Sequence, residues 1–485
     1  MSAAAAASGS TGVVFPRRSS RGVILGLSAG QVFCFGCAGM LVAAAVYAGG
    51  FPAVLVAAPL WGALVVLALA RVAGVPIVQW APVCVQYAGR RAMGQLEFRR
   101  EQGVRRPEKV LALPGDVASL RLHRDEHETG MVIDPHGRTM TAVLRLRHPA
   151  FVLLDVDDQR QRAMAWAQAL AGYCNAGSYI SRIQTLERTL PDSSNDARAY
   201  WDRAGVHDGS WASRSYQQLM ATAAPDALRH ESLMAVTLDM RAAKRAGSGQ
   251  GRGLAGLAAL LRAQMASIER TMQNARLRPV GWLGPDEVTS VLRTAYDPTV
   301  TGAYDRHPGV GRSPGSAGPM AVRERWGHLQ ADGVYHCVLI VTEWPRVEVE
   351  AGFLWPVVLT AGVQRTFTLL MEPQITAKAL KEAQAERLKY DTDRKAREKA
   401  DLQVGVADEV EAAEVHQREA ELTAGHGSMN YVGLLAVSAP TRKELDRRVS
   451  EVVDTAAQSA VRLDRLYGRQ GQGFVAAALP LGQGL

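Results

Sequence analysis

The chain has 485 residues, of which 47% are hydrophobic and 21% charged, and this composition excludes a disordered polymer, a collagen-like repeat and a disulfide-stapled miniprotein. Its five cysteines are too few and too scattered for a secreted disulfide framework, so a reducing compartment is expected. The net charge of +8 lies within residues 1–109, because the rest of the chain holds 44 basic and 44 acidic residues. Direct nucleic-acid binding is therefore not expected.

The N-terminal region has the pattern of a membrane anchor. Residues 1–21 form a basic tail rich in Ala and Ser, for which we expect disorder. The next 49 residues, 22–70, contain no Asp, Glu, Lys, Arg or His. A bilayer core of about 30 Å needs only about 20 apolar residues per helix. The sequence therefore predicts a transmembrane helical hairpin over residues 22–71, with helices at 23–47 and 53–70 and a Gly- and Pro-containing turn between them.

Arginines flank this hairpin on both sides, which by the positive-inside rule places both termini in the cytoplasm of a two-helix, multi-pass protein of the cell membrane. The orienting residues are Arg17, Arg18, Arg21, Arg71, Arg90 and Arg91. A cleaved signal peptide is the competing interpretation, but its apolar core would have only about 7 to 15 residues. Residues 72–107 are predicted to be a basic segment along the membrane surface, because Pro76 and Pro82 interrupt the apolar pattern. A third crossing through 72–89 is the alternative, and it would place the rest of the chain outside.

From residue 108 onward, strand and helix patterns alternate, which predicts a membrane-anchored α+β protein with sheets covered by helices. The first cytoplasmic domain, 108–245, is expected to have strands at 119–124, 130–134, 139–147, 178–186 and 233–240, with helices at 155–171, 196–203 and 215–221. A Gly- and Ser-rich joint, 246–253, leads to the second domain, 254–485. Its predicted helices are 254–275, 285–295 and 442–467. A second sheet is expected from strands at 277–283, 333–343, 364–371, 430–438 and 474–479, and residues 298–319 are expected to be a mobile loop.

Residues 375–423 are a long, charged, Ala-rich helical stretch without proline. The first part is mainly basic and the second part mainly acidic, with Gly405 between them. One interpretation is a solvated helix with internal ion pairs. The other is a helical hairpin folded near Gly405, or a rod that pairs with another subunit, in which opposite charges meet. The candidate charge-pairing residues are Lys395, Arg397, Lys399, Glu409, Glu411 and Glu414.

Patterns for known chemistry are weak in this sequence. No lysine follows a glycine, which excludes a P-loop ATPase. Cys34 and Cys37 have redox spacing but lie in the predicted first crossing, where small packing residues are the ordinary interpretation. Metal-capable residues occur at 123–128, but without a known ligand spacing. We therefore predict no catalytic, cofactor-binding or metal-binding residues, and no enzymatic activity.

The C-terminal third contains several short motifs, which are Thr342-Glu343-Trp344-Pro345-Arg346, Glu348, Phe353-Leu354, Pro356, Arg365, Met371-Glu372-Pro373, the segment 419–426, Arg465-Leu466-Tyr467-Gly468 with Gln470, and the terminal Leu479-Pro480-Leu481-Gly482-Gln483-Gly484-Leu485. Together with the predicted membrane hairpin, these motifs resemble a family of actinobacterial integral membrane proteins found in conjugation or type IV secretion-like loci. The layout also resembles the N-terminal, non-ATPase region of type IV secretion ATPases. The absence of a P-loop means that ATP hydrolysis is not implied.

The resemblance implies a non-enzymatic inner-membrane scaffold of a conjugative or secretion apparatus. Its expected partners are the lipid bilayer, other secretion subunits including a separate ATPase, and further copies of the chain as a homo-oligomer. A membrane subunit of a type VII-like secretion system is the alternative, and a membrane-tethered enzyme is the third interpretation. Neighbouring genes would distinguish the first two, because conjugation requires DNA-processing genes and type VII-like secretion requires small paired substrates.

Overall fold

The computed structural model describes residues 28–485 except for 73–74, 102–106, 108, 148–152, 176, 193–194, 224–226, 246–252, 275, 307–312, 346–348, 351, 400–405 and 424–426. The described chain falls into two compact units, one within residues 16–96 and the other over residues 97–485. The expected basic tail 1–21 and most of the expected joint 246–253 lie outside the described residues.

The smaller unit is mainly helical. Its elements are α1 (Ala29–Val56), α2 (Ala58–Leu69), the short strands β1 (Arg71–Val72) and β2 (Val75–Pro76), and α3 (Ile77–Ala92). Ser28 caps α1, because its hydroxyl accepts from the Gln31 amide while the Gln31 side chain accepts from the Ser28 amide. Large apolar side chains such as Phe33, Met40 and Tyr47 are exposed along α1. A helix of this kind lacks the buried face of a soluble core helix.

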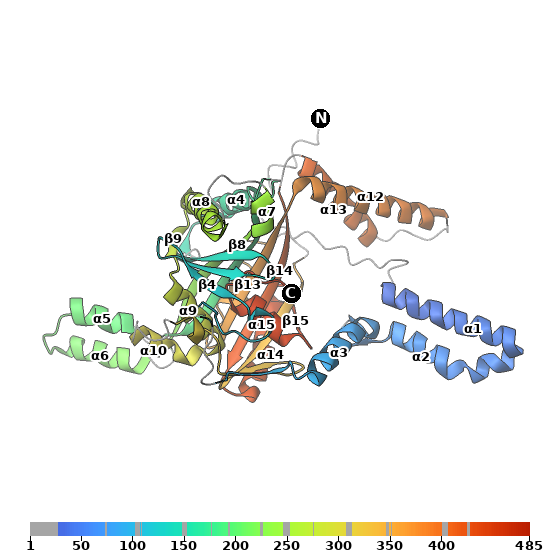
Figure 1. The fold of residues 1–485 in the computed structure, drawn as a ribbon, viewed down its shortest axis with the longest axis horizontal. Helices are drawn as coiled ribbons and strands as arrows, with labels where there is room; N and C mark the ends of the chain where they lie inside the picture. Colours follow the sequence, from blue (N-terminus) through green and yellow to red (C-terminus); the bar gives the residue numbers. More distant parts are fainter. Residues whose placement is uncertain are drawn as a thin grey trace. The chain divides into compact units, whose positions relative to one another are not determined.

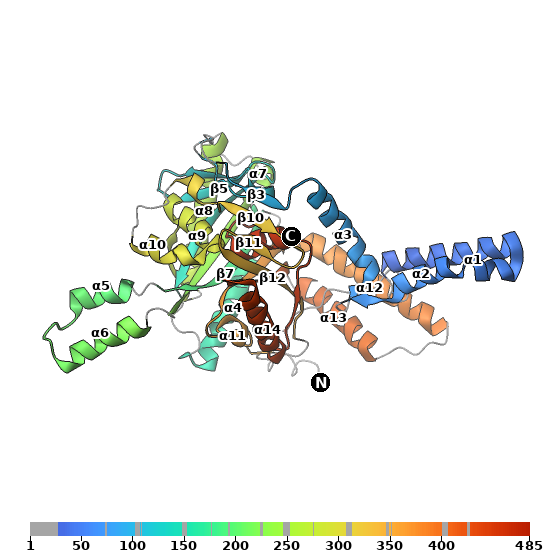
Figure 2. The same ribbon diagram turned by 90° about the horizontal axis from the view of Figure 1, so that it is seen from below.

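Among the described residues, one helical stretch, Gly30–Val56, is long and apolar enough to cross a membrane. Gly50 is a non-helical residue inside α1, with φ 67° and ψ −153°, and it falls in the turn expected from the sequence. The buried Gln31 side chain donates to the Ala68 carbonyl at 2.8 Å, so the start of α1 lies beside the end of α2 (Figure 2). α2 has only 12 residues. The two-helix topology is therefore not established by the structure and stays a prediction.

The larger unit is built on one antiparallel sheet of 13 described strands (Figure 1). Its order is β3-β10-β11-β12-β14-β13-β7-β8-β6-β5-β4, with β15 paired to β12 and β9 paired to β6. The expected second sheet is not separate, because β7 from the first predicted domain pairs with β13 from the second. The first edge strand is β3 (Glu97–Arg99).

The sheet consists of two halves that have the same order of elements. In each half, three strands are followed by a helix, a long strand, a helical pair, a second long strand, a helix, a short strand and a last helix. The first half contains β4 (Arg121–Arg124), β5 (Gly130–Asp134), β6 (Thr139–Arg147), α4 (Val156–Ala171), β7 (Ile180–Pro191), α5 (Asn195–Ala204), α6 (Trp211–Ala223), β8 (Leu228–Asp239), α7 (Met240–Arg245), α8 (Gly253–Asn274), β9 (Arg278–Trp282) and α9 (Pro285–Tyr296).

The second half repeats this order, although α7 has no counterpart in it. It contains β10 (Ala321–Glu324), β11 (Leu329–Ala331), β12 (Val334–Glu343), α11 (Trp355–Val358), β13 (Gln364–Gln374), α12 (Thr376–Lys399), α13 (Val406–Thr423), β14 (Ser428–Ala439), α14 (Arg442–Gln458), β15 (Arg462–Arg465) and α15 (Gln470–Ala478). The strand pairings are repeated as well, since β8 joins β6 to β7 as β14 joins β12 to β13. The halves are therefore related by a pseudo-twofold axis between β7 and β13.

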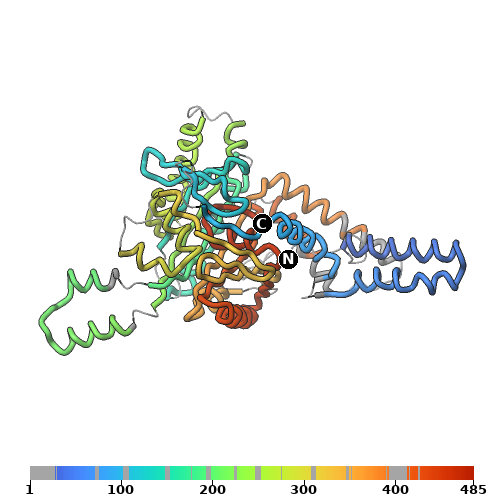
Figure 3. The backbone as a smooth tube through the Cα atoms, turned by 60° about the horizontal axis from the view of Figure 1, so that its bottom comes forward, coloured from blue at the N-terminus to red at the C-terminus, as the bar shows by residue number. Residues whose placement is uncertain are grey.

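Helices cover both faces of the sheet in matching places. On one face α9 and α15 share a core with strands of both halves, and the rings of Tyr296 and Phe474 lie 5.0 Å apart. On the other face α8 packs on β5, β6 and β8, and α14 packs on β12, β14 and β15. The pairs α5–α6 and α12–α13, named here the first arm and the second arm, leave the sheet at opposite ends because β7 and β13 are antiparallel (Figures 1 and 3).

The last helix of each half is anchored to strands of the other half. At the end of α9, the Tyr296 carbonyl accepts from Nε2 of the buried His336 on β12 at 2.9 Å, and the Ser438 hydroxyl lies 2.8 Å from Nδ1. After α15, the buried Gln184 side chain on β7 donates to the Leu479 carbonyl and accepts from the Gly482 amide. These buried polar groups are paired, so they stabilise the joint between the halves.

Three expectations differ from the structure. Residues 474–478 of the expected strand 474–479 belong to helix α15, because Ala476, Ala477 and Ala478 are small enough to lie directly on the sheet. The predicted helix 442–467 ends at Gln458, where Ala460 adopts φ 54°, and the chain continues as β15. Part of the expected mobile loop forms η4 (Pro298–Val300), α10 (Thr301–Arg306) and η5 (Pro314–Ser316), whereas 307–312 lie outside the described residues.

Acid should destabilise the larger unit through His336. Burial lowers the pKa of His336 to about 4, although the Tyr296 carbonyl opposes this shift. The unfolded imidazole has a pKa of about 6.5, so as the pH falls the unfolded chain takes up a proton that the folded chain does not. The resulting loss of stability should begin near pH 6.5, reach about 2 kcal/mol by pH 5 and be complete below about pH 4.

Thermal unfolding of the wild type, His336→Gln and the exposed control His136→Gln at pH 7 and pH 5 measures this effect. The His336→Gln protein should be less stable at pH 7 but should lose less stability between the two pH values. The control should behave as the wild type does. An equal loss in all three proteins would show that His336 does not titrate on unfolding.

Candidate interaction surfaces

The charged stretch 375–423 forms the second arm, in which two helices lie antiparallel. Their contact is a small apolar seam in which Ala379, Ala383 and Leu422 are buried. Among the described side chains, two ion pairs cross between the helices, Arg387 to Glu419 at 2.8 Å and Arg418 to Glu386 at 3.9 Å. Alanines allow the backbones to approach closely, and opposite charges at the rim favour this register.

The structure assigns the backbone of each candidate charge-pairing residue to this arm. Lys395, Arg397 and Lys399 belong to α12, and Glu409, Glu411 and Glu414 belong to α13. Their side chains, and Gly405, lie outside the described residues. The cross-helix pairs that are described involve other residues of the same stretch, so pairing by the six candidates stays a prediction.

The first arm occupies the equivalent position but has little core of its own. Trp201 packs on Tyr216 with ring centroids 4.7 Å apart. Three large side chains are mostly exposed, Tyr200 at 66%, Trp211 at 77% and Leu219 at 61%. Helices of 10 and 13 residues are marginal in water without tertiary packing. The first arm therefore has the composition of a contact surface, which its sequence periodicity alone did not reveal.

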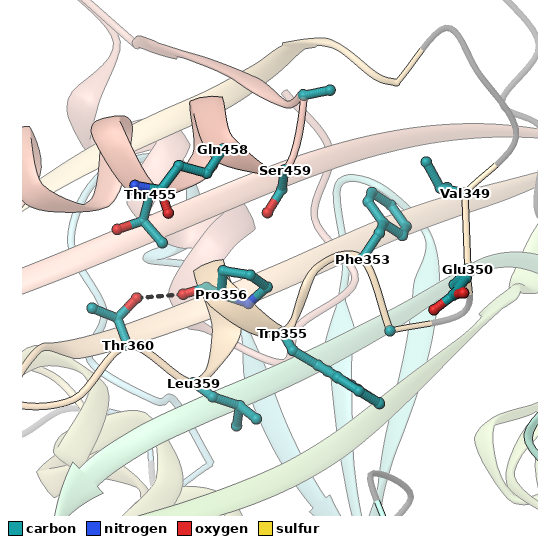
Figure 4. A pocket seen from close by; sticks show the side chains of 12 residues that line it. Val349, Glu350, Phe353, Trp355, Pro356, Leu359, Thr360, Thr455, Gln458 and Ser459 are labelled. Carbon is teal, nitrogen blue, oxygen red and sulfur yellow. Dashed lines mark hydrogen bonds between the residues drawn. The ribbon is translucent and has the colours of Figure 1, made fainter. Parts of the chain in front are cut away.

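A groove of about 800 Å³ lies between the segment 349–360 and the end of α14 (Figure 4). Phe353, Trp355 and Leu359 provide much of its apolar lining, and Thr455 and Ser459 face them from the other wall. Phe353 and Pro356 belong to the motifs that carry the family resemblance. The sequence motif thus marks a wall of this groove.

Arg365 holds that wall in place. This arginine is 3% exposed, and its guanidinium donates to the carbonyls of Val358, Thr360 and Val363. Burial lowers the pKa of Arg365 to about 10, which leaves the side chain charged at neutral pH. Three carbonyls around one buried cation fix the turn after α11, so the groove wall is preorganised.

The metal-capable stretch 123–128 is arranged around a cation. Asp125 lies 3.3 Å and Glu126 3.6 Å from the guanidinium of Arg262 on α8. Among the described residues, no cluster of three or more His, Cys, Asp or Glu side chains could hold a metal ion. A partly buried ionic cluster elsewhere joins Arg188 to Glu231 at 2.9 Å and Glu231 to Arg145 at 3.1 Å. It connects three neighbouring strands, which is a structural role.

The membrane-orienting arginines are only partly within the described chain. Arg71 lies on β1, and Arg90 and Arg91 lie in the last turn of α3. Arg71 and Arg91 are exposed and Arg90 is partly exposed. Arg17, Arg18 and Arg21 lie outside the described residues. α3 buries no residue, and its expected position along a membrane surface stays a prediction.

Comparison with known proteins adds no assignment to this geometry. No protein-family model matches the chain, and a comparison with curated proteins likewise gives no match.

Proposed function

We propose that the protein is a non-enzymatic scaffold of the inner membrane in a conjugative or type IV secretion-like apparatus, where it contacts a separate ATPase and other subunits. The observation that carries this proposal is the pair of helical arms on one rigid sheet, in a chain that also has a helix of membrane-spanning length. The apparatus itself is inferred from the sequence motifs that resemble the actinobacterial family.

In this proposal the apolar region forms a two-helix hairpin in the bilayer, with α3 on its surface and both termini in the cytoplasm. The position of Gly50 and the hydrogen bond from Gln31 to Ala68 support a reversal of the chain. An α2 of 12 residues is short for a crossing, but the helical residues between Gly50 and Ala57 extend the second half of the hairpin. The exposed apolar side chains of α1 would then face lipid.

In this scaffold the two arms provide the surfaces that contact neighbouring subunits. The second arm, which has its own seam and ion pairs, is a preformed rod. The first arm exposes aromatic side chains that a partner subunit would cover. The two arms lie at opposite ends of the sheet. One chain can therefore contact two neighbouring subunits and hold them at a fixed distance from each other.

Membrane anchoring is tested by extraction. The wild-type protein should remain in the membrane fraction after an alkaline carbonate wash. Met40 is exposed in α1, and Met40→Arg should reduce insertion because an arginine at a helix centre costs about 2.5 to 3.5 kcal/mol. Met40→Leu is the matched control and should insert as the wild type does. Release of the wild type into the supernatant would contradict the anchor.

The second arm is tested by charge reversal. Arg387→Glu or Glu419→Arg alone should loosen the pairing of α12 with α13, because each places like charges at a 2.8 Å contact. The double reversal should restore most of the pairing between α12 and α13, with a coupling free energy between the two residues of about 0.2 to 1 kcal/mol. Hydrogen exchange of the α12 and α13 amides measures the pairing of the two helices. The efficiency of conjugative transfer or secretion in cells measures the effect on function.

A reversal inside one helix is the control. Lys378 and Glu382 form an i,i+4 pair within α12, so Glu382→Lys should change exchange less than Glu419→Arg does. Reversal of Lys395, Arg397 and Lys399 to Glu should be offset in part by reversal of Glu409, Glu411 and Glu414 to Lys. Simple additivity of both sets would show that the two helices do not face each other through these charges.

A further inference from the structure

We infer that one edge of the sheet binds the anionic lipid headgroups of the membrane that anchors the chain. This edge, named here the basic edge, is formed by β3, β10, the turn 325–328 and the start of α14, and it contains Arg99, Arg323, Arg325, Arg442 and Arg465. The inference rests on the membrane anchor of the proposed function. It adds a second contact with the bilayer, made by the larger unit itself.

The strand β3 brings residues of the expected membrane-surface segment into the sheet. β3, β10 and β11 are successive strands at this edge (Figure 2). Glu97 lies opposite Arg323, and Arg99 is two residues further along β3. Because alternate residues of a strand share a face, the side chains of Glu97, Arg99 and Arg323 lie on one face of the sheet. Glu101 follows the strand, and its exposed carboxylate offsets the charge of Arg99.

At this edge one carboxylate is shared by two arginines. The Glu97 carboxylate lies 3.9 Å from the guanidinium of Arg323 and 3.8 Å from that of Arg325. All three side chains are about half exposed. Both distances are longer than N–H···O hydrogen bonds, which measure about 2.7 to 3.2 Å. The guanidinium groups can therefore donate to phosphate oxygens, and together they carry one positive charge more than Glu97 balances.

A second group of the same kind lies beside the turn 325–328. Asp446 on α14 is 3.9 Å from Arg442 and 3.1 Å from Arg465 on β15. Burial lowers the pKa of His328 in the turn, and nearby arginines lower it further although Asp446 opposes them. These arginines are Arg442, Arg465 and Arg325. The two groups therefore adjoin, because arginines of both act on the same imidazole.

The charges at the start of α14 are not explained by the stability of that helix. Arg442 and Lys443 are exposed in its first turn, where the positive end of the helix dipole disfavours cations. Glu444 in the same turn is paired with Arg447 at 2.6 Å and with Arg448 at 2.9 Å. An anionic surface in front of this turn would offset the repulsion.

The length of the connecting chain identifies the occupant. The four residues Met93–Leu96 separate the end of α3 at Ala92 from the start of β3 at Glu97. A chain extends by at most about 3.6 Å per residue, so β3 begins within about 18 Å of the end of α3. In the proposed topology α3 lies on the cytoplasmic surface of the membrane, where anionic lipids attract basic residues near the bilayer. Lipid phosphates are therefore within reach of the basic edge.

The aromatic residues beside the basic edge do not favour nucleic acid as the occupant. Proteins bind single-stranded nucleic acid by stacking its bases on aromatic side chains. Here the rings of Trp326 and Tyr467 stack on each other, with centroids 6.2 Å apart, and the ring of His328 lies 6.0 Å from that of Tyr335. Headgroup phosphates require only the guanidinium donors.

Hydrogen exchange of the full chain in lipid nanodiscs tests this inference. Discs of phosphatidylcholine alone are compared with discs that also contain phosphatidylglycerol. The amides of β3 and of the turn 325–328 should exchange about threefold more slowly, or slower still, in the anionic discs. This difference should disappear at about 1 M salt, where the Debye length falls to about 3 Å.

Two failures of this experiment are distinguishable. Equal exchange in both kinds of disc, for a chain that is inserted in them, would overturn the inference and leave the membrane anchor intact. A chain that enters neither disc would contradict the anchor and the inference together. Slower exchange on addition of single-stranded DNA, without an effect of phosphatidylglycerol, would assign the basic edge to nucleic acid and overturn the inference as well.

Variants locate the effect on the chain. Replacement of Arg99, Arg323 and Arg325 by Gln should abolish the difference between the discs, whereas Lys at the same positions should retain most of it. The control removes three exposed charges elsewhere in the larger unit, through Arg121→Gln, Arg241→Gln and Lys244→Gln. It should behave as the wild type does. Loss of the difference in the control as well would assign the effect to net charge and contradict the proposed surface.

Discussion

The pairing of β7 with β13 is the interaction on which the larger unit depends. Seven residue pairs, from Arg365 with Thr189 to Met371 with Ile183, join two sets of strands into one sheet. The helices reinforce this joint, because α9 and α15 meet at Tyr296 and Phe474 and each ends on strands of the other half. Each half alone would expose part of its hydrophobic core, because the apolar cluster beneath α9 and α15 contains side chains from both halves.

The repeated order of elements gives an internal comparison that a single sequence rarely offers. Both arms interrupt a pair of long antiparallel strands at the same place, yet they differ in how they are stabilised. The second arm buries Ala379, Ala383 and Leu422, whereas the first leaves Trp211 and Leu219 exposed. The exposed apolar surface of the first arm is therefore not a necessary property of the arm architecture. In the proposed scaffold, a partner subunit would cover this surface.

The sequence predicted local elements well where their period was clear. The strand at Val334–Glu343 and the helix at Pro285–Tyr296 agree with the ranges 333–343 and 285–295 expected from the sequence. It could not show that β7 pairs with β13, because non-local pairing leaves no local pattern. Ala476–Ala478 read as a strand since small apolar runs suit both structures. The groove was missed because its two walls, the segment around Phe353 and Pro356 and the end of α14, are far apart in the sequence and meet only in the folded chain.

Membrane anchoring with the sheet unit in the cytoplasm is tested most directly by thiol labelling of intact cells. In a background without the native cysteines, Phe51→Cys places a thiol beside the Gly50 turn at a position that is 74% exposed. It should react with an impermeant reagent in intact cells, whereas Ser316→Cys in the larger unit should react only after permeabilisation. Labelling of Ser316→Cys in intact cells, or protection of Phe51→Cys, would contradict a two-helix hairpin with a cytoplasmic scaffold.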